Sequence, residues 1–257
     1  MEKYLRNDIM IGVILAAGMG TRLRPLTDEI SKPLLEINGE TLLERMIKNF
    51  LKENTKKFIV ITGYFSEKTD ELCASLEKKY DIQIKTIKNE KYDVTNTSVS
   101  TYLASSFIEE NKLKDDFILI NGDNVLDPKI IHNIHESTNS SLIIDNVKSL
   151  NEESFKLIIE NNVIVGIGKE LPIEKSSGEF IGVSKIVNKD LKQFNKLLKE
   201  LIEDNPQNYY DYVYEFLSKK TKLDYVYTDG LQWTEIDDHN DYKFAKELLG
   251  LDEFNIL

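Results

Sequence analysis

The chain has 257 residues, of which 41% are hydrophobic and 30% are charged, and its formal net charge at pH 7 is −11. This composition is typical of a folded globular protein and excludes a largely disordered chain. The negative charge argues against general binding to nucleic acid or to an anionic membrane surface, so an anionic ligand has to be captured by local groups.

The first ten residues lack the pattern of a secretion signal, which is a basic stretch followed by an apolar run and a small-residue cleavage site. The longest apolar run, 9–19, contains glycine and is much shorter than the roughly 20 residues that a membrane-spanning helix needs. We therefore expect a cytoplasmic protein without membrane insertion. The one cysteine, Cys73, cannot form an internal disulfide, and we expect it to be structural.

The first half of the chain alternates apolar runs of strand length with amphipathic segments of helical spacing. The expected strands are 11–16, 58–62, 82–87 and 117–121. The helices expected between them are 41–53, 66–80, with Ser66 as its N-cap, and 97–109. This alternation predicts an α/β fold with a doubly wound, mostly parallel sheet, in which ligands bind at the carboxyl ends of the strands.

The second half alternates less regularly. Asn161 and Asn162 are suited to the positive φ angles of a tight hairpin turn. Because no repeat or linker separates the halves, we expect one domain over 1–257, with a core (about 1–140), a small β-rich and helical lid (about 141–235) and a closing segment (236–257). The expected strands are 141–146, 155–160, 163–168, 179–187 and 224–227, and the expected helices are 189–203, 208–219 and 240–249.

The loop after the first strand reads GMGTRLRPLTDEISKPLL over 18–35. It does not fit a dinucleotide-binding loop, because Leu23 stands where the third glycine would be, and the chain has no GxxxxGK followed by serine or threonine. The remaining interpretation is a loop whose backbone amides bind a triphosphate. Its glycines let the main chain approach phosphate oxygens, while Arg22 offers a two-pronged donor and Lys32 a point charge.

The stretch GMGTRLRPLT…KPLLEING resembles the signature of the sugar-phosphate nucleotidylyltransferase superfamily, whose members join a nucleoside triphosphate to a small phosphorylated substrate. The similarity continues at INGDN (120–124) and EIDD (235–238) and implies a Rossmann-like nucleotidyltransferase fold. The chain is similar to compact cytidylyltransferases that act on phosphocholine or 2-aminoethylphosphonate, also in NEKYDVTNTSVSTYLA (89–104) and GEFIGVSKI (178–186). The core would then bind CTP and the lid the acceptor.

The resemblance implies roles for individual residues. Lys32 and Arg22 would be catalytic, because they neutralise charge on the reacting phosphates. The nucleotide would be bound by the end of the first strand, by the glycine loop and by a polar segment near residue 96. These nucleotide-binding candidates are Leu15, Ala16, Ala17, Gly18, Gly20, Thr21, Arg22, Asn96, Ser98 and Ser100.

The resemblance also implies a Mg²⁺ site formed by Asp123, after the fourth strand, and Asp237, before the last helix. Mg²⁺ binds through one or two carboxylates together with phosphate oxygens, and two carboxylates far apart in sequence can meet at the strand ends of one sheet. Asp238 is the alternative to Asp237, and it could instead cap the last helix or lie behind the metal ligands.

An acceptor that carries an ammonium group beside its phosphate needs a carboxylate or aromatic faces around the ammonium. The candidates are Glu179, Asp211, Tyr210 and Trp233. We rank the two carboxylates first, because Tyr210 and Tyr214 lie one helical turn apart, which is more typical of a packed core than of a ligand cage.

The expected reaction is the in-line attack of an acceptor phosphate or phosphonate oxygen on the α-phosphorus of CTP, with pyrophosphate leaving. Because the acceptor oxygen is already ionised near neutral pH, no general base is needed. Two alternatives stay open: uridylyl or thymidylyl transfer to a sugar 1-phosphate, and a regulatory subunit that binds a nucleotide without catalysis. The identity of the acceptor and the oligomeric state, for which a homodimer is one option, also stay open.

Overall fold

The structure of this chain is a computed structural model that describes residues 10–250. Residues 1–9, at the start of the chain, and residues 251–257, at the end of the closing segment, lie outside the described range. Within this range no helix combines the length and the apolar character needed to cross a membrane. The strands are β1 (Met10–Ala16), β2 (Glu36–Ile37), β3 (Glu40–Thr41), β4 (Lys57–Thr62), β5 (Gln83–Lys88), β6 (Asp116–Asn121), β7 (Asn124–Leu126), β8 (Ser140–Asp145), β9 (Lys156–Glu160), β10 (Val163–Gly168), β11 (Gly178–Ile186), β12 (Leu223–Tyr227) and β13 (Trp233–Glu235). The α-helices are α1 (Leu42–Leu51), α2 (Ser66–Tyr80), α3 (Thr97–Glu110), α4 (Pro128–His135), α5 (Asn188–Asp204), α6 (Val213–Ser218) and α7 (His239–Leu248).

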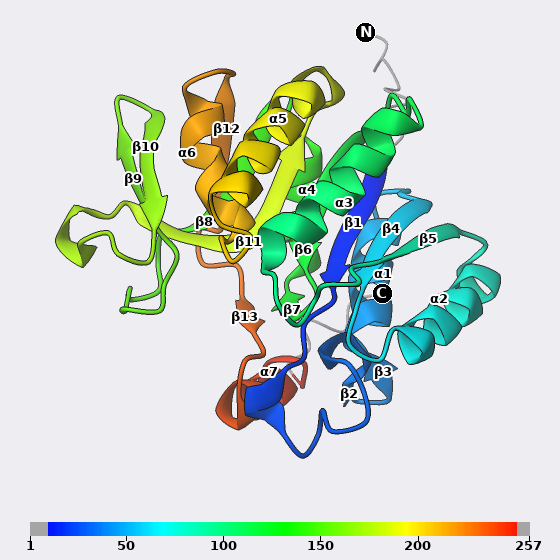
Figure 1. The fold of residues 1–257 in the computed structure, drawn as a ribbon. Coiled ribbons are helices and arrows are strands. Elements are labelled where there is room, and N and C mark those ends of the chain that lie inside the picture. The colour runs from blue at the N-terminus through cyan, green and yellow to red at the C-terminus, as the bar shows by residue number, and fades with distance from the viewer. Residues whose placement is uncertain (1–9, 251–257) are drawn as a thin grey trace, which may run out of the picture.

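Nine of the described strands form one sheet. β5, β4, β1 and β6 lie side by side in this order and run parallel. β11 continues the sheet antiparallel to β6 and pairs in turn with β8 and β9, while β12 adds to β8 and β10 adds to β9. The predicted α/β fold with a doubly wound, mostly parallel sheet is confirmed (Figure 1).

The second half of the chain extends the sheet of the first half. In β11, Val183 lies opposite Ile120 of β6 and Ile186 lies opposite Phe117. The sheet therefore crosses the expected boundary near residue 140. The hairpin of β9 and β10 lies at the end of the sheet, on the left in Figure 1, and the division into a core and a lid stays a prediction.

Alternate residues of the central strand β1 face two hydrophobic cores, because successive side chains of a strand point to opposite sides. Ile14 packs in one core with side chains of α1, α2, α4 and α7, and this core also holds Cys73. Val13 packs in the other core with side chains of α3, α5 and α6. Figure 1 shows α3 and α5 side by side in front of the sheet.

Several predicted elements differ from the structure. Ser66 is the first residue of α2 and not its N-cap, which is Phe65 in a left-handed conformation with φ 49°. The helix expected over 208–219 begins later, as a 3₁₀ turn (Tyr210–Tyr212) that leads into α6. The hairpin turn is confirmed, with φ angles of 50° at Asn161 and 62° at Asn162.

The prediction missed the short strands β7 and β13 and the helix α4. β13 pairs antiparallel with β7, which brings residues 233–235 beside residues 124–126. The N-cap of α4 is Asp127, whose carboxylate accepts a hydrogen bond from the Lys129 backbone at 2.8 Å. The first residue of the helix is Pro128. Both residues are sequence signals of a helix start.

The end of β6 lies against the end of β1 at Gly122. The Gly122 backbone N–H donates to the Leu15 carbonyl at 2.8 Å, and a Cβ atom at position 122 would lie 2.3 Å from that oxygen. Because only glycine permits this approach, Asp123 lies next to the loop that follows β1.

We predict that Gly122→Ala lowers the free energy of unfolding by about 1–3 kcal/mol, because the new methyl group forces the two strand ends apart. The matched control is Gly18→Ala, since a Cβ atom there meets no heavy atom within 4 Å. Urea denaturation measures both variants, and equal stability of the two would contradict this interpretation of the close approach.

Candidate functional site

A cleft of about 720 Å³ lies at the carboxyl ends of β1 and β6. The glycine loop forms one part of its wall. Residues from β11, from β13 and from the segments near 89–100 and 148–155 form further parts of the wall. Most of the candidate residues lie on this one surface. Those that line it are Leu15, Ala16, Ala17, Gly18, Gly20, Arg22, Lys32, Asn96, Ser100, Asp123, Glu179, Asp211, Trp233 and Asp237.

Three candidate residues do not line the cleft. Thr21 is exposed at the start of a 3₁₀ turn, and Ser98 is fully buried within α3. Tyr210 is also fully buried, and its hydroxyl donates to Asn121 Oδ1 at 3.2 Å. A direct contact of Tyr210 with an acceptor therefore does not fit the structure, because its ring belongs to the core and Tyr210 itself does not line the cleft.

The glycine loop is folded back on itself by hydrogen bonds to Gly20, which has a φ angle of 60°. Its carbonyl accepts from the Leu23 backbone at 2.9 Å and from the Thr27 hydroxyl at 2.7 Å. A Cβ atom at Gly20 would lie 3.6 Å from the Lys32 side chain. The fold of the loop thus places the aliphatic part of Lys32 against its glycine backbone.

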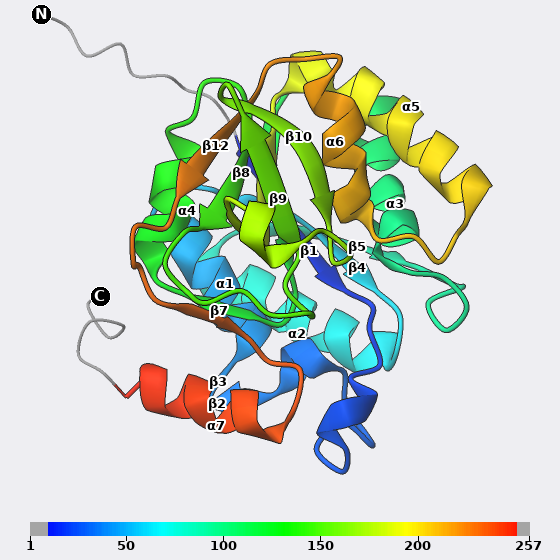
Figure 2. The same cartoon turned by 90° about the vertical axis from the view of Figure 1, so that its left-hand side faces the viewer.

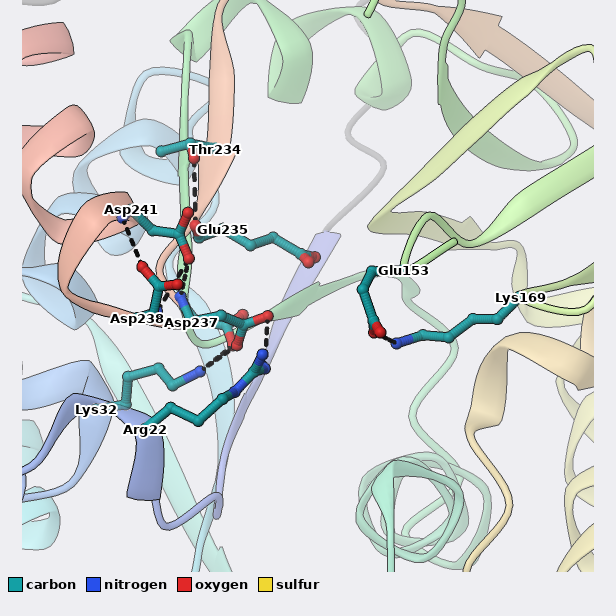
Figure 3. Close-up of polar contacts among 10 residues, drawn as sticks. Arg22, Lys32, Glu153, Lys169, Thr234, Glu235, Asp237, Asp238 and Asp241 are labelled. Carbon is teal, nitrogen blue, oxygen red and sulfur yellow. Dashed lines mark hydrogen bonds and ion pairs between the residues drawn. The ribbon is translucent and has the colours of Figure 1, made fainter. Parts of the chain in front are cut away.

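Lys32 joins two carboxylates that are far apart in the sequence. Its ammonium donates to Asp123 Oδ2 at 2.8 Å and to Asp237 Oδ1 at 2.9 Å. Arg22 forms an ion pair with the other oxygen of Asp237 at 3.0 Å. Figure 3 shows Arg22 and Lys32 converging on Asp237 from the glycine loop.

Lys32 and Asp237 of this cluster keep their charges at neutral pH. Burial by itself would lower the pKa of Lys32, but the carboxylates of Asp123 and Asp237 outweigh it and raise that pKa well above its ordinary value. Burial would likewise raise the pKa of Asp237, and the contacts with Lys32 and Arg22 hold it below its usual range. The cleft therefore contains permanent charges of both signs beside the glycine loop.

Asp237 is held near the glycine loop by α7. The Tyr242 hydroxyl donates to the Glu36 carbonyl at 2.6 Å, and the His239 ring contacts the Arg24 carbonyl at 2.8 Å. Asp238 caps α7, because its carboxylate accepts from the Asn240 backbone at 2.7 Å. Figure 2 shows α7 below the sheet, beside the loop that follows β1.

The carboxylates of Asp123 and Asp237 fit a divalent metal ion. Asp123 Oδ1 is buried and has no hydrogen-bond partner among the described residues, so it is available as a ligand. No group of three or more His, Cys, Asp or Glu side chains within 10–250 is arranged to hold a metal on its own. A metal ion here would need phosphate oxygens to complete its coordination, which is the usual mode of Mg²⁺ binding.

Three further carboxyl groups that line the cleft have raised pKa values. Burial raises the pKa of Asp211 to about 7, although the positive charge of Lys169 acts against it. Burial also raises the pKa of Glu179, against a hydrogen bond from Ser154. The pKa of Glu235 lies well above its ordinary value because of burial and repulsion by Asp123. A cationic ligand would stabilise the ionised forms of these groups.

The prediction missed several residues of the cleft wall, among them Glu235, Lys148, Lys169 and Glu153. Lys169 and Glu153 form an ion pair of 3.0 Å, which Figure 3 shows across the cleft from Arg22 and Lys32. Lys169 directly follows β10, and its place after an expected strand is the signal that could have identified it.

Comparison with known proteins places the chain in a family. The family model described as nucleotidyl transferase matches residues 11–248. The choline-phosphate cytidylyltransferase of Haemophilus influenzae is 29% identical over 244 residues, which cover 91% of this chain and 94% of that protein. The bifunctional IPC transferase and DIPP synthase of Aquifex aeolicus is 27% identical over 92% of this chain, which spans about half (51%) of the length of that relative.

Solved structures agree with these sequence relatives. The CTP:phosphocholine cytidylyltransferase LicC of Streptococcus pneumoniae superimposes with a TM-score of 0.74 and 25% identity, covering 94% of this chain and 99% of that one. The inositol-1-phosphate CTP transferase of T. maritima has a TM-score of 0.76 at 18% identity over 94% of this chain and 97% of that one, which shows a shared fold. Because the family model spans nearly all of the described residues, the chain belongs to the nucleotidyl transferase family of enzymes.

Proposed function

We propose that this protein transfers CMP from CTP to a small phosphate or phosphonate that carries an amine, with release of pyrophosphate. The observation that carries the proposal is the cluster of Lys32, Arg22, Asp123 and Asp237 in a cleft that is also lined by the carboxyl groups of Glu179, Asp211 and Glu235. The cluster suits a triphosphate with a metal ion, and the further carboxyl groups suit an ammonium group. The sequence relatives that are named as cytidylyltransferases support the choice of CTP.

A nucleoside triphosphate would lie along the glycine loop. Backbone amides there can donate to phosphate oxygens, and Arg22 and Lys32 supply positive charge beside the loop of this acidic chain. Beside the loop, Ser100 accepts a hydrogen bond from Asn89 at 3.1 Å, and Asn96 caps α3 by accepting from the Thr97 backbone at 2.8 Å. These fixed polar groups are placed to contact the nucleoside.

Asp123 and Asp237 would hold Mg²⁺, for which the free Asp123 Oδ1 is suited. The bound ion would supply charge neutralisation at the phosphate oxygens of the nucleotide. Lys32 contacts both carboxylates and Arg22 contacts Asp237, and their ammonium and guanidinium groups can turn to the phosphates once the carboxylates have another partner. They would then stabilise the negative charge that builds up on the reacting phosphate.

The acceptor would lie between Lys169 and the carboxyl groups of Glu179 and Asp211. Lys169 offers an ammonium to the acceptor's phosphate, and the carboxyl groups offer oxygens to its amine. An acceptor phosphate or phosphonate oxygen can then attack the α-phosphorus without a general base, since it is ionised near neutral pH. Holding both substrates in one cleft supplies the required orientation.

The proposed reaction predicts Mg²⁺-dependent release of pyrophosphate from CTP in the presence of one amine-bearing acceptor. The experiment crosses CTP, UTP, dTTP, ATP and GTP with phosphocholine, phosphoethanolamine, 2-aminoethylphosphonate, inositol 1-phosphate and glucose 1-phosphate, and EDTA removes the metal. Release with CTP and an amine-bearing acceptor supports the proposal.

Other outcomes of the same experiment would contradict it in separate ways. Release with CTP and inositol 1-phosphate alone would refute the claim that the acceptor carries an amine. Release with UTP or dTTP and glucose 1-phosphate would refute the cytidylyl transfer, and undiminished release in EDTA would refute the dependence on a metal ion.

Lys32→Met should lower kcat by about 100- to 1,000-fold and change the KM for CTP much less, because the charge acts mainly on the transition state. Lys78→Met, at an exposed position of α2, is the matched control and should keep both constants. A Lys32→Met variant with normal kcat and a raised KM would instead assign Lys32 to ground-state binding.

The pKa of Asp211 predicts how acceptor binding depends on pH. Since that pKa is raised to about 7, the carboxyl is neutral below pH 7 and ionised above it, and an ammonium prefers the ionised form. Between pH 6 and pH 8 the KM for an amine-bearing acceptor should fall in both proteins, and the factor of this fall should be about ten times larger in the wild type than in Asp211→Asn. Comparing the two profiles cancels the titration of the acceptor phosphate, and parallel profiles would remove Asp211 from the acceptor site.

A further inference from the structure

The indole ring of Trp233 forms a cation–π contact with a lysine of the protein itself. The Lys148 ammonium lies 3.8 Å from the centroid of the ring and donates to the Trp233 carbonyl at 2.5 Å. Both residues line the cleft. Although Lys148 as a whole is exposed, its charged end therefore covers the aromatic face that an acceptor cation would use.

Asp145 fixes both partners of this contact. One of its oxygens accepts a hydrogen bond from the Trp233 indole N–H. The other accepts from the backbone N–H of Val147 at 2.7 Å and of Lys148 at 3.0 Å. Because Asp145 is buried at the end of β8 and Trp233 begins β13, the ring and the start of the lysine side chain are held in place by the sheet.

Several carboxyl groups act on the Lys148 ammonium. Burial lowers the pKa of Lys148, and the charges of Asp145, Glu179, Glu235 and Asp241 act against this shift. An aromatic ring with nearby carboxylates is the chemistry that binds an organic ammonium. The side chain of Lys148 thus occupies a cation site with its own ammonium.

We propose that Lys148 determines the acceptor specificity by competing for the face of Trp233, so that the cleft disfavours a trimethylammonium group and accepts a primary ammonium. This inference rests on the proposed function. A trimethylammonium group has no N–H donor and depends on aromatic faces, whereas a primary ammonium can donate to Glu179 and Glu235 without the ring. Among amine-bearing acceptors, phosphoethanolamine and 2-aminoethylphosphonate fit the occupied site and phosphocholine does not.

Trp233 is the one tryptophan of the chain, so its fluorescence reports on this site directly. Tetramethylammonium is titrated into the wild type, Lys148→Met, Lys148→Arg and the exposed-site control Lys78→Met. We expect half-saturation of the fluorescence change at a concentration about tenfold lower in Lys148→Met, a difference of about 1.4 kcal/mol. Lys148→Arg keeps a cation over the ring and should behave as the wild type does.

The kinetic counterpart is the ratio of kcat/KM for phosphocholine to that for phosphoethanolamine with CTP. This ratio should rise about tenfold in Lys148→Met and stay unchanged in Lys148→Arg and Lys78→Met. Equal affinity for tetramethylammonium in the wild type and Lys148→Met, or a preference of the wild type for phosphocholine, would overturn the inference. A fluorescence shift in Lys148→Met without CMP transfer by the wild type to any acceptor would refute the proposed function and leave the competition at Trp233 standing.

Discussion

The interaction on which the site depends is the contact of one ammonium with two carboxylates. Lys32 follows the glycine loop, Asp123 follows β6, and Asp237 precedes α7, so the three residues come from the beginning, middle and end of the described chain. Two carboxylates this close would repel each other without a cation between them. The ammonium therefore offsets the repulsion within the pair, and it ties the segment before α7 to the sheet.

The cleft contains charged groups in two different electrostatic environments. Lys32 and Asp237 keep their charges, because each is paired with groups of opposite sign. Burial raises the pKa values of Asp211 and Glu179, and burial together with repulsion by Asp123 raises that of Glu235. Carboxyl groups of nearly equal chemistry thus differ in pKa because their neighbours differ. A cationic ligand would lower the raised pKa values of Asp211, Glu179 and Glu235 more than the pKa of Asp237.

The sequence predicted the sheet well because its strands are apolar and evenly spaced, and it predicted the glycine loop because that motif is local. It could not reveal that β11 pairs with β6, since pairing between distant strands leaves no mark in the spacing of residues. Tyr210 lies in the core, which its helical spacing from Tyr214 favoured. Lys148 was missed because its role depends on Trp233, which lies 85 positions later in the chain.

The pairing of β11 with β6 has a consequence for how such an enzyme can diversify. β11, which contains Glu179, is hydrogen-bonded to β6, and Asp123 lies two residues after β6, so a residue proposed for the acceptor and one proposed for the metal lie on or directly after neighbouring strands of one sheet. In the proposed function, replacement of side chains and loops at the rim of the cleft, such as the segment around Lys148, would change the acceptor while the nucleotide end stays unchanged. Such a molecule can acquire new substrates through few substitutions without refolding its catalytic centre.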